Sequence, residues 1–337
     1  MTPRLPLQTI LAAAILAGGV QAAPVNPTVF YNSFDHRHPV LARVQPGVMV
    51  ETRTIDAGGI DEHGKRSGVR GNPLTGPFYI EGAEPGDSIE VRLHRIRMNR
   101  DWGFSTFRLG LYSLDPESIE GLYSPVRKPN SVIEGRDSIV RWHIDRQAGK
   151  VRLEDPVSRV HKLEFAAVPM LGCVGVAAPG VFAPTSGISG PYGGNMDYNR
   201  INEGTSVYLP VYHPGALLFL GDGHALQADG EPNGTGVETS MEVAFEVRIH
   251  KKKSLKNPRV TGPDFISSVG SQPEFVSSLD RALRIATSDM VEWLVTEYKL
   301  EPWAAHLLIS YAGQYDVVTV GGSVALRLPR TTLPAVP

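Results

Sequence analysis

The chain of 337 residues is 42% hydrophobic and 20% charged, so it has enough apolar residues for a sizeable core. Its formal net charge of −2 excludes the strongly basic character that would favour a nucleic-acid partner. Cys173 is its only cysteine, which excludes an intrachain disulfide.

Residues 1–22 predict a secretory signal peptide. An arginine at position 4 precedes an apolar run from Ile10 to Val20, and the small residues around Ala22 suit a cleavage site. The run is too short for a membrane span, so we expect no membrane association after the signal is removed. The sequence therefore predicts an exported, periplasmic protein with a mature chain of residues 23–337.

The mature chain is expected to be rich in β-strands. Its 35 glycines and 27 prolines suit many tight turns between short strands. Alternating apolar residues predict strands in two halves, about 25–150 and 151–250, with a hairpin across Arg146–Gly149. The clearest alternation runs from Met241 to Ile249.

Helices are predicted mainly over residues 273–313. Apolar residues at helical spacing predict one amphipathic helix, or two with a break near Thr287-Ser288. A further helix is expected to begin at Pro302 and to stop at Gly313. We therefore predict a single mainly β domain of sandwich-like or barrel-like architecture, with a C-terminal pair of helices packed against it.

A polar segment, GDGHALQADGE, follows the apolar run ALLFL. It carries Asp222, His224, Asp229 and Glu231, and Glu238 follows shortly afterwards. Such Gly-Asp pairs also occur in solvated hairpin turns. Carboxylates beside buried strands are nevertheless costly without a cation or hydrogen-bond donors. One histidine among carboxylates therefore indicates a divalent-cation site, with a plain turn as the alternative.

Two other polar segments lie at predicted strand ends, where sheets commonly present functional groups. IDAGGIDEHG contains Asp61 and His63, and SGPYGGNMD contains Asn195 and Asp197. His63 suits a ligand and a turn residue equally well. Ligands from segments this far apart can meet only in the folded chain.

Common nucleophile motifs do not occur: the sequence contains neither G-x-S-x-G nor H-E-x-x-H. Cys173 lies in the apolar segment VPMLGCVGVAAPG, which favours a small buried hydrophobe over a nucleophile. A cysteine hydrolase stays as the enzymatic alternative to a metal-dependent one.

The segments GGNMD (193–197), GDGHALQADGE (221–231) and GTGVETSMEV (234–243) resemble the acetamidase/formamidase family. PLTGPFYIEGAEPGD (73–87) and MVEWLVTEYKL do so as well, so the resemblance spans nearly the whole mature chain. It implies a β-rich, sandwich-type fold. It also implies an amidase that hydrolyses short linear aliphatic amides to carboxylate and ammonia, with a divalent metal. The signal peptide indicates an exported subgroup.

The resemblance also implies the roles of individual residues. The preferred metal-site positions are Asp197, Asp222, His224 and Glu238. The polar segment IDAGGIDEHG adds His63 and Asp61 as possible further ligands. Glu231 or Glu238 would accept the proton, with Gln227 and Asp229 in support, and backbone N–H groups of the Gly193-Gly194-Asn195 turn would stabilise an oxyanion.

Two positions depart from the family pattern. Family members often carry a histidine near the mature N-terminus, where this chain has Phe30-Tyr31, and another before P-L-T-G-P, where it has Asn72. If those histidines bind metal or substrate, then His36, His38 or His63 would have to substitute, or the activity has changed.

The expected cofactor is a divalent metal, with zinc preferred and calcium or manganese as alternatives. It would polarise the amide carbonyl and lower the pKa of a water molecule. The expected partners are a small-molecule amide and a second copy in a homodimer. The rival function is a non-catalytic module in which calcium organises acidic loops to hold a saccharide or peptide.

The metal hypothesis makes a geometric prediction. Residues two apart in an extended chain point to the same side, so Asp222 and His224 should face one cation. Side-chain atoms of Asp197 and Glu238 should then lie within about 5 Å of the His224 ring.

Overall fold

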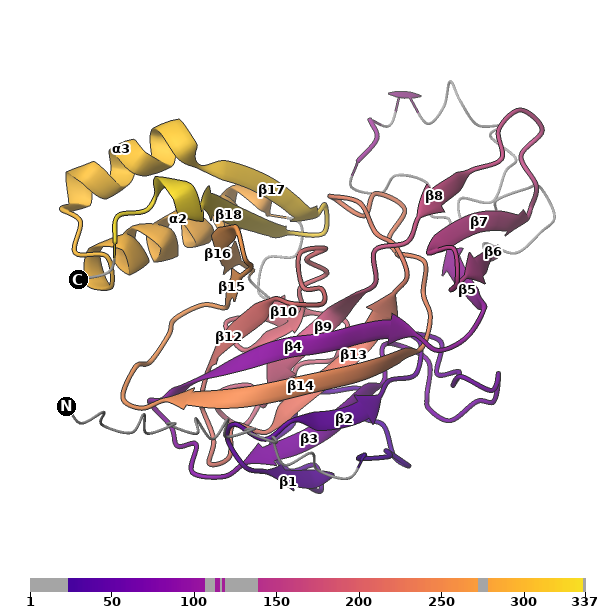
Figure 1. The fold of residues 1–337 in the computed structure, drawn as a ribbon, viewed down its shortest axis with the longest axis horizontal. Helices are drawn as coiled ribbons and strands as arrows, with labels where there is room; N and C mark the ends of the chain where they lie inside the picture. Colours follow the sequence, from indigo (N-terminus) through magenta and orange to yellow (C-terminus); the bar gives the residue numbers. More distant parts are fainter. Residues whose placement is uncertain (1–23, 107–112, 116, 119–138, 272–277, 336–337) are drawn as a thin grey trace, which may run out of the picture.

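The structure is a computed structural model that describes residues 24–106, 113–115, 117–118, 139–271 and 278–335 (Figure 1). The predicted signal peptide lies outside the described residues. The described chain is mainly β with two helices near the C-terminus, which confirms the predicted fold class. None of the described helices has the length and apolar character needed to cross a membrane.

The largest sheet has eight strands. They are β2 (Val50–Arg53), β4 (Ser88–Met98), β12 (Ser206–Pro210), β14 (Met241–His250), β15 (Arg259–Thr261), β16 (Phe265–Gly270), β17 (Gln314–Thr319) and β18 (Ser323–Pro329). Their order across the sheet is β17-β18-β16-β15-β12-β4-β14-β2. The two long strands β4 and β14 pair antiparallel along their whole length, as the alternation from Met241 to Ile249 predicts.

A six-stranded sheet packs against it. Its strands are β1 (Ala42–Val44), β3 (Leu74–Ile80), β9 (Met170–Val176), β10 (Ser189–Gly190), β11 (Gly193–Asn195) and β13 (Leu218–His224), in the order β1-β3-β13-β9-β11-β10. Phe78 of β3 meets Phe245 of β14 edge to face at 5.1 Å between ring centroids, so the core lies between the two sheets. Both large sheets mix strands from the two predicted halves, so the halves do not form separate sheets.

A small four-stranded sheet stands beside this sandwich. It contains β5 (Trp102–Thr106), β6 (Ile139–Asp145), β7 (Lys150–Asp155) and β8 (Glu164–Ala166), in the order β5-β6-β7-β8. The β6–β7 pair is the predicted hairpin across Arg146–Gly149. Ile144 and Val151 of this sheet pack against Ala225 and Val237, which hold it next to the segments that follow β13.

The helices form a separate layer over β16 and β18. Ser278 caps α2 (Leu279–Thr296) by accepting the backbone N–H of Arg281, and the apolar face of α2 packs on the sheet. The helix is continuous through Thr287-Ser288, and the Thr287 hydroxyl donates to the Leu283 carbonyl one turn earlier. The second helix, α3 (Pro302–Ala312), begins at Pro302 and is capped by Gly313, as predicted. A 3₁₀ turn at Arg330–Thr332 follows β18.

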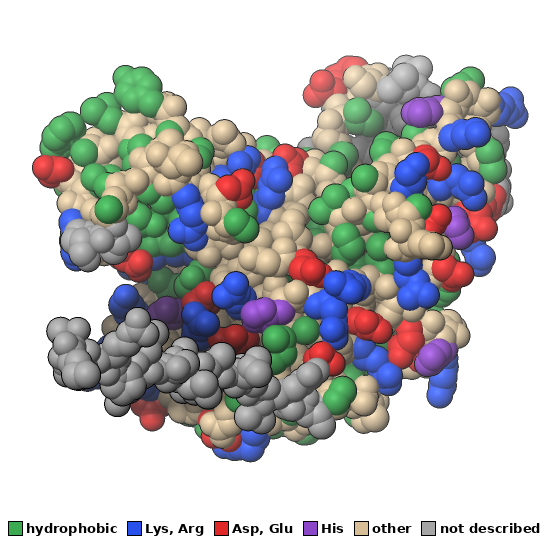
Figure 2. Space-filling model, viewed as in Figure 1, with side chains coloured by type: hydrophobic (Ala, Val, Ile, Leu, Met, Phe, Trp, Pro, Cys, Tyr) green, Lys and Arg blue, Asp and Glu red, His purple; other side chains and the backbone are tan. Residues whose placement is uncertain are grey.

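The surface is mixed in character. Figure 2 shows positive and negative side chains interspersed on the β-rich part, and apolar side chains gathered over the α3 end. The exposed apolar residues of α3 are Trp303, Leu307 and Tyr311. The face seen in Figure 2 has no extended area of a single charge, in agreement with the small net charge.

Candidate metal centre

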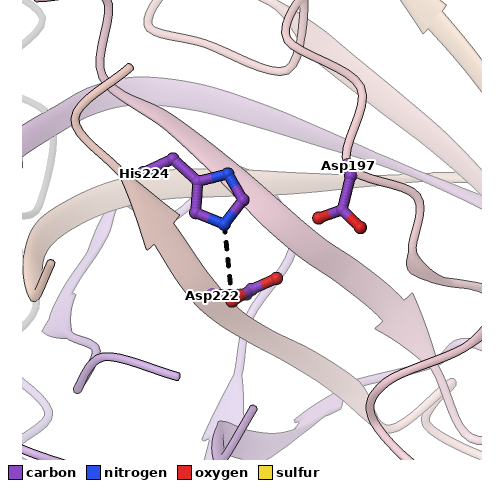
Figure 3. A group of neighbouring side chains, drawn as sticks. All are labelled: Asp197, Asp222 and His224. Carbon is purple, nitrogen blue, oxygen red and sulfur yellow. Dashed lines mark ion pairs between the residues drawn. The ribbon is translucent and has the colours of Figure 1, made fainter. Parts of the chain in front are cut away.

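The predicted ligands meet at one end of the six-stranded sheet. Asp222 and His224 project from β13, and Asp197 follows β11 (Figure 3). Glu238 precedes β14 and forms a bridge with His224. The strand β13 does not stop before the polar segment, as the apolar run ALLFL suggests, but continues through His224. The ligand segment is therefore part of a buried strand and not a solvated turn.

The distances agree with a single site. His224 Nε2 lies 3.5 Å from Asp222 Oδ1 and 3.1 Å from Glu238 Oε1. Ligand atoms of Asp197, Asp222 and His224 all lie within 4.8 Å of one another. The same holds for His224, Glu231 and Glu238. The predicted convergence of Asp197 and Glu238 on the His224 ring is therefore confirmed.

Three of the acidic residues have left-handed backbone conformations. The φ angles are 51° at Asp197, 56° at Asp222 and 45° at Glu231. Side chains other than glycine rarely adopt this region, and aspartate tolerates it better than most. Such residues concentrate at functional sites, where the surrounding structure holds them in place.

Gln227 determines the hydrogen-bonding state of His224. Its Oε1 lies 2.8 Å from His224 Nδ1, and its Nε2 donates to the Asp197 carbonyl at 2.7 Å. A carbonyl oxygen can only accept, so Nδ1 carries a proton and Nε2 is the nitrogen available to a cation. Nε2 faces Asp222 and Glu238, which is the arrangement that a metal-binding histidine needs.

One atom on each predicted ligand is buried without a hydrogen-bond partner among the described residues. These atoms are Asp197 Oδ1, Asp222 Oδ1, His224 Nε2 and Glu238 Oε2. The four side chains are between 1% and 4% exposed. Buried polar atoms are nearly always paired, so four unpaired atoms in one place require an unseen partner. Carboxylate oxygens and one imidazole nitrogen fit a divalent cation such as zinc.

The protonation equilibria show how costly this cluster is without a cation. Burial raises the pKa of Glu238 to about 8, against the opposing effect of His224. Burial also raises the pKa of Asp197 well above its usual range, and Glu231 and Asp222 add to the effect. Burial acts to lower the pKa of His224, but Glu238 and Asp222 overcome it and raise that pKa. A cation would relieve the repulsion between these carboxylates.

An amide network supports the centre from one side. Asn195 Nδ2 donates to Asp197 Oδ2. Asn72 Nδ2 donates to Asn195 Oδ1 at 2.8 Å and to Asp222 Oδ2 at 3.1 Å. Asn72, which stands where the family often has a histidine, therefore touches the cluster directly. The backbone N–H of Asn195 donates to the Ile188 carbonyl, so the predicted role of this N–H in an oxyanion hole is wrong.

Cys173 contacts this network through Asn195, but its surroundings are not those of a reactive thiol. Its Sγ lies 2.8 Å from Asn195 Oδ1 and 3.2 Å from the Ser186 carbonyl oxygen, and its single proton can be donated to either. The side chain is fully buried, and burial raises the pKa of the thiol well above its usual range. Cys173 therefore has the environment of a structural residue.

Several sequence-based candidates lie outside the cluster. Asp61 accepts from the backbone of His63 and Lys65 in its own loop, and the His63 side chain is 80% exposed beside Glu62. The additional ligand roles of Asp61 and His63 are therefore not supported. Asp229 pairs with Asn199 at the surface and not with the predicted ligands.

The side chains of His36 and His38, near the predicted mature N-terminus, also make their contacts outside the cluster. His38 stacks on Tyr31 and bonds to the Ser33 hydroxyl, and His36 stacks on His213. Neither belongs to a potential ligand group among the described residues. They do not replace the family histidines at the centre.

The importance of Gly172 of β9 for the site was not predicted from the sequence. A Cβ atom on Gly172 would collide with the carboxylates of both Asp197 and Asp222. Glycine therefore lets the two side chains meet over the backbone of β9. The glycines within the apolar run MLGCVGV were the available signal, because glycine inside a strand often marks a close approach.

Comparisons with known proteins show similarity to one family of amidases. The sequence profile of the Acetamidase/Formamidase family matches residues 187–309, a range that includes all four ligand positions. The structure matches the crystal structure of an acetamidase from Yersinia enterocolitica with a TM-score of 0.76, at 27% identity, over 95% of this chain and 96% of that one. The chain is therefore similar to the acetamidase/formamidase family, in sequence over residues 187–309 and in structure over nearly its whole length.

Curated members of the acetamidase/formamidase family match over shorter ranges. A putative formamidase of Schizosaccharomyces pombe is 29% identical over 223 residues, which are 55% of this chain and 52% of that protein. A formamidase of Methylophilus methylotrophus is 26% identical over 278 residues, 65% of each chain. The match thus spans about half to two thirds of the length of these relatives.

Proposed function

We propose that this protein is a metal-dependent hydrolase of linear amides, which converts R–CO–NH₂ and water into R–COO⁻ and NH₄⁺. The observation that carries the proposal is the group of buried, unpaired atoms on Asp197, Asp222, His224 and Glu238. The names of the relatives, formamidase and acetamidase, support an amide as the substrate.

The residues of the centre would have different roles in metal binding and positioning. Asp197 Oδ1, Asp222 Oδ1 and His224 Nε2 would hold the cation, and Glu238 would complete the set. When bound, a divalent cation polarises an amide carbonyl and lowers the pKa of a neighbouring water molecule. Gln227 keeps the proton on His224 Nδ1, and the Asn72–Asn195 pair holds the carboxylates of Asp222 and Asp197 in place.

Glu231 is the proton carrier in this proposal. It is half-buried, whereas Glu238 is buried, so Glu231 is the member of the group that can exchange a proton with solvent. One of its carboxylate oxygens lies within 4.8 Å of ligand atoms of His224 and Glu238. It would accept a proton from the attacking water and deliver it to the leaving nitrogen.

Zinc fits this donor set better than calcium. Calcium prefers six to eight oxygen ligands, whereas a histidine nitrogen with carboxylates is typical of zinc or manganese. Since His224 Nε2 is one of the unpaired atoms, the calcium-organised binding module receives no support from the donor set. We therefore retain the hydrolase as the proposed function, with zinc preferred.

The test combines metal analysis with an activity assay. The purified protein is analysed for bound metal by mass spectrometry, and ammonia release from short amides is measured with and without a chelator. We expect near-stoichiometric zinc or manganese, and a loss of hydrolysis on chelation. The His224→Ala variant should lose metal and hydrolysis together while its circular dichroism is unchanged.

His63→Ala is the matched control, because His63 is exposed and lies outside the cluster. It should behave like the wild type in both measurements. Wild-type metal content or hydrolysis in His224→Ala would contradict the proposed centre. Bound calcium without amide hydrolysis would favour the binding module instead.

Export and homodimerisation are further proposals. The signal pattern of residues 1–22 predicts a mature periplasmic protein that begins after Ala22, which mass spectrometry of the secreted product would test. Analytical ultracentrifugation of the mature protein would test the homodimer.

A further inference from the structure

A row of four paired residues runs from the metal centre to an arginine. His224 bridges to Glu238, Glu238 bridges to Phe104 of β5, and Phe104 pairs with Arg141 of β6. Residues directly opposite each other on neighbouring strands have their side chains on the same face. The imidazole, the carboxylate, the phenyl ring and the guanidinium therefore project from one face in that order.

The hydrogen bonds define the spacing along this row. Phe104 and Glu238 exchange both backbone bonds, at 3.1 and 2.7 Å, so they are a hydrogen-bonded pair. Opposed residues in antiparallel strands have Cα atoms about 4.5–5.5 Å apart, which places the Cα atoms of Glu238 and Arg141 about 10 Å apart. A small linear molecule can span this distance between the cation site and the guanidinium.

The far end of the row opens into a pocket. Its volume is about 600 Å³, and its lining includes Phe104, Trp102, Ile60, Arg141 and Arg70. No carboxylate is among the described lining residues, which also include Arg66. Asp155 of β7 lies opposite Arg141 on the side away from Phe104. A pocket with an apolar floor and an arginine rim suits a ligand with an apolar body and an anionic end.

We infer that the substrate is an amide whose acyl chain ends in a carboxylate, that is, the monoamide of a linear dicarboxylic acid. The amide would lie at the metal centre, the methylene chain over the Phe104 ring, and the distal carboxylate against Arg141, with Arg70 at the rim. This inference rests on the proposed hydrolysis, in which one water cleaves the C–N bond to give a dicarboxylate and NH₄⁺. An extended six-carbon chain spans roughly 6 Å between its terminal carbons, which fits the row once the arginine side chain is included.

The test compares two six-carbon amides that differ only at the far end, adipic acid monoamide and hexanamide. Ammonia release by the zinc-loaded protein gives kcat/KM for each, and calorimetry on His224→Ala gives their affinities without turnover. We expect at least a tenfold preference for adipic acid monoamide in both measurements. In Arg141→Gln the preference should fall towards one.

Arg152→Gln is the matched control, because Arg152 is an exposed arginine on β7 of the same small sheet. It removes the same charge and should keep the preference of the wild type. A preference that also falls in Arg152→Gln would indicate a general charge effect and would overturn the role of Arg141.

The outcomes separate this inference from the proposed function. Equal kcat/KM for the two amides, with no change in Arg141→Gln, would overturn the anion pocket and leave the amidase intact. Tenfold tighter binding of adipic acid monoamide that is lost with Arg141, without ammonia release from either compound, would support the pocket and overturn the amidase.

Discussion

Gln227 Oε1 accepts the Nδ1 proton of His224 at 2.8 Å and so leaves Nε2 as the ligand atom. His224 ends β13 and Gln227 follows three residues later, and both residues are buried. A partner of this kind holds the ring and its tautomer, and its loss typically lowers metal affinity 10–100-fold.

We therefore expect Gln227→Ala to bind zinc roughly 10–100-fold more weakly than the wild type, as measured by competition with a chelating dye. Asp229→Ala is the control two residues away, because Asp229 pairs with Asn199 at the surface and should not affect zinc binding. Wild-type affinity in Gln227→Ala would show that the tautomer is set by another group.

Cys173→Ser should keep most of the ammonia release. The serine hydroxyl can still donate to Asn195 Oδ1, which accepts from the thiol at 2.8 Å in the native protein. A nucleophilic thiol would instead be required for every turnover. Complete loss of activity in a variant with wild-type circular dichroism and zinc content would refute the metal mechanism.

The buried ion pair of Asp56 and Arg100 should be important for stability. Arg100 Nη2 lies 2.6 Å from Asp56 Oδ2, and the two side chains are 2% and 0% exposed. Asp56→Ala would leave a buried guanidinium without its counter-charge, at a cost of about 3–5 kcal/mol in the free energy of unfolding. Urea denaturation measures this difference.

The exposed pair of Arg284 and Asp280 provides the comparison for that experiment. Their side chains are 70% and 77% exposed, so Asp280→Ala should cost less than about 1 kcal/mol. Equal effects of the two substitutions would mean that burial does not control the strength of these pairs.

Asp87 should make stability depend on acid pH. Burial alone would raise its pKa, but hydrogen bonds from the side chain of Lys251 and from the backbones of Lys252 and Glu84 overcome this and lower the pKa below 3.8. A lowered folded-state pKa stabilises the fold above the unfolded pKa, and this contribution is lost as the pH falls through the folded pKa.

Asp87→Asn should therefore lower the free energy of unfolding at pH 7 by about 1–3 kcal/mol, with a smaller difference from the wild type below about pH 4. Urea denaturation at both pH values measures the change. A difference that stays the same or grows in acid would show that Asp87 acts through its shape and not through its charge.

Much of this fold can be predicted from local patterns. The alternation in β14, the Pro302 start of α3 and the hairpin between β6 and β7 all follow from residues close in sequence. The meeting of Asp197 with Asp222 and His224 was expected from the family resemblance and not from the spacing of these residues. Local signals were sufficient where one segment forms one element.

The failures come from long-range pairing and irregular backbone. The end of β13 was predicted too early because Gly-Asp-Gly resembles a turn, while pairing with β9 carries the strand to His224. Nothing in the sequence near Phe104 indicates that it pairs with Glu238, which is more than a hundred residues away. The row that ends at Arg141 is therefore visible only in three dimensions.

The left-handed backbone at Asp197, Asp222 and Glu231 also bears on how such a protein can evolve. Asparagine tolerates this backbone region about as well as aspartate, whereas valine or isoleucine would be strained. A single Asp→Asn exchange at Asp197 or Asp222 would thus remove a ligand charge and preserve the local backbone. One substitution would therefore be enough to lose metal binding while the fold is kept. An Asn at the position of Asp197 or Asp222 in a relative would mark a protein that uses the same fold for another purpose.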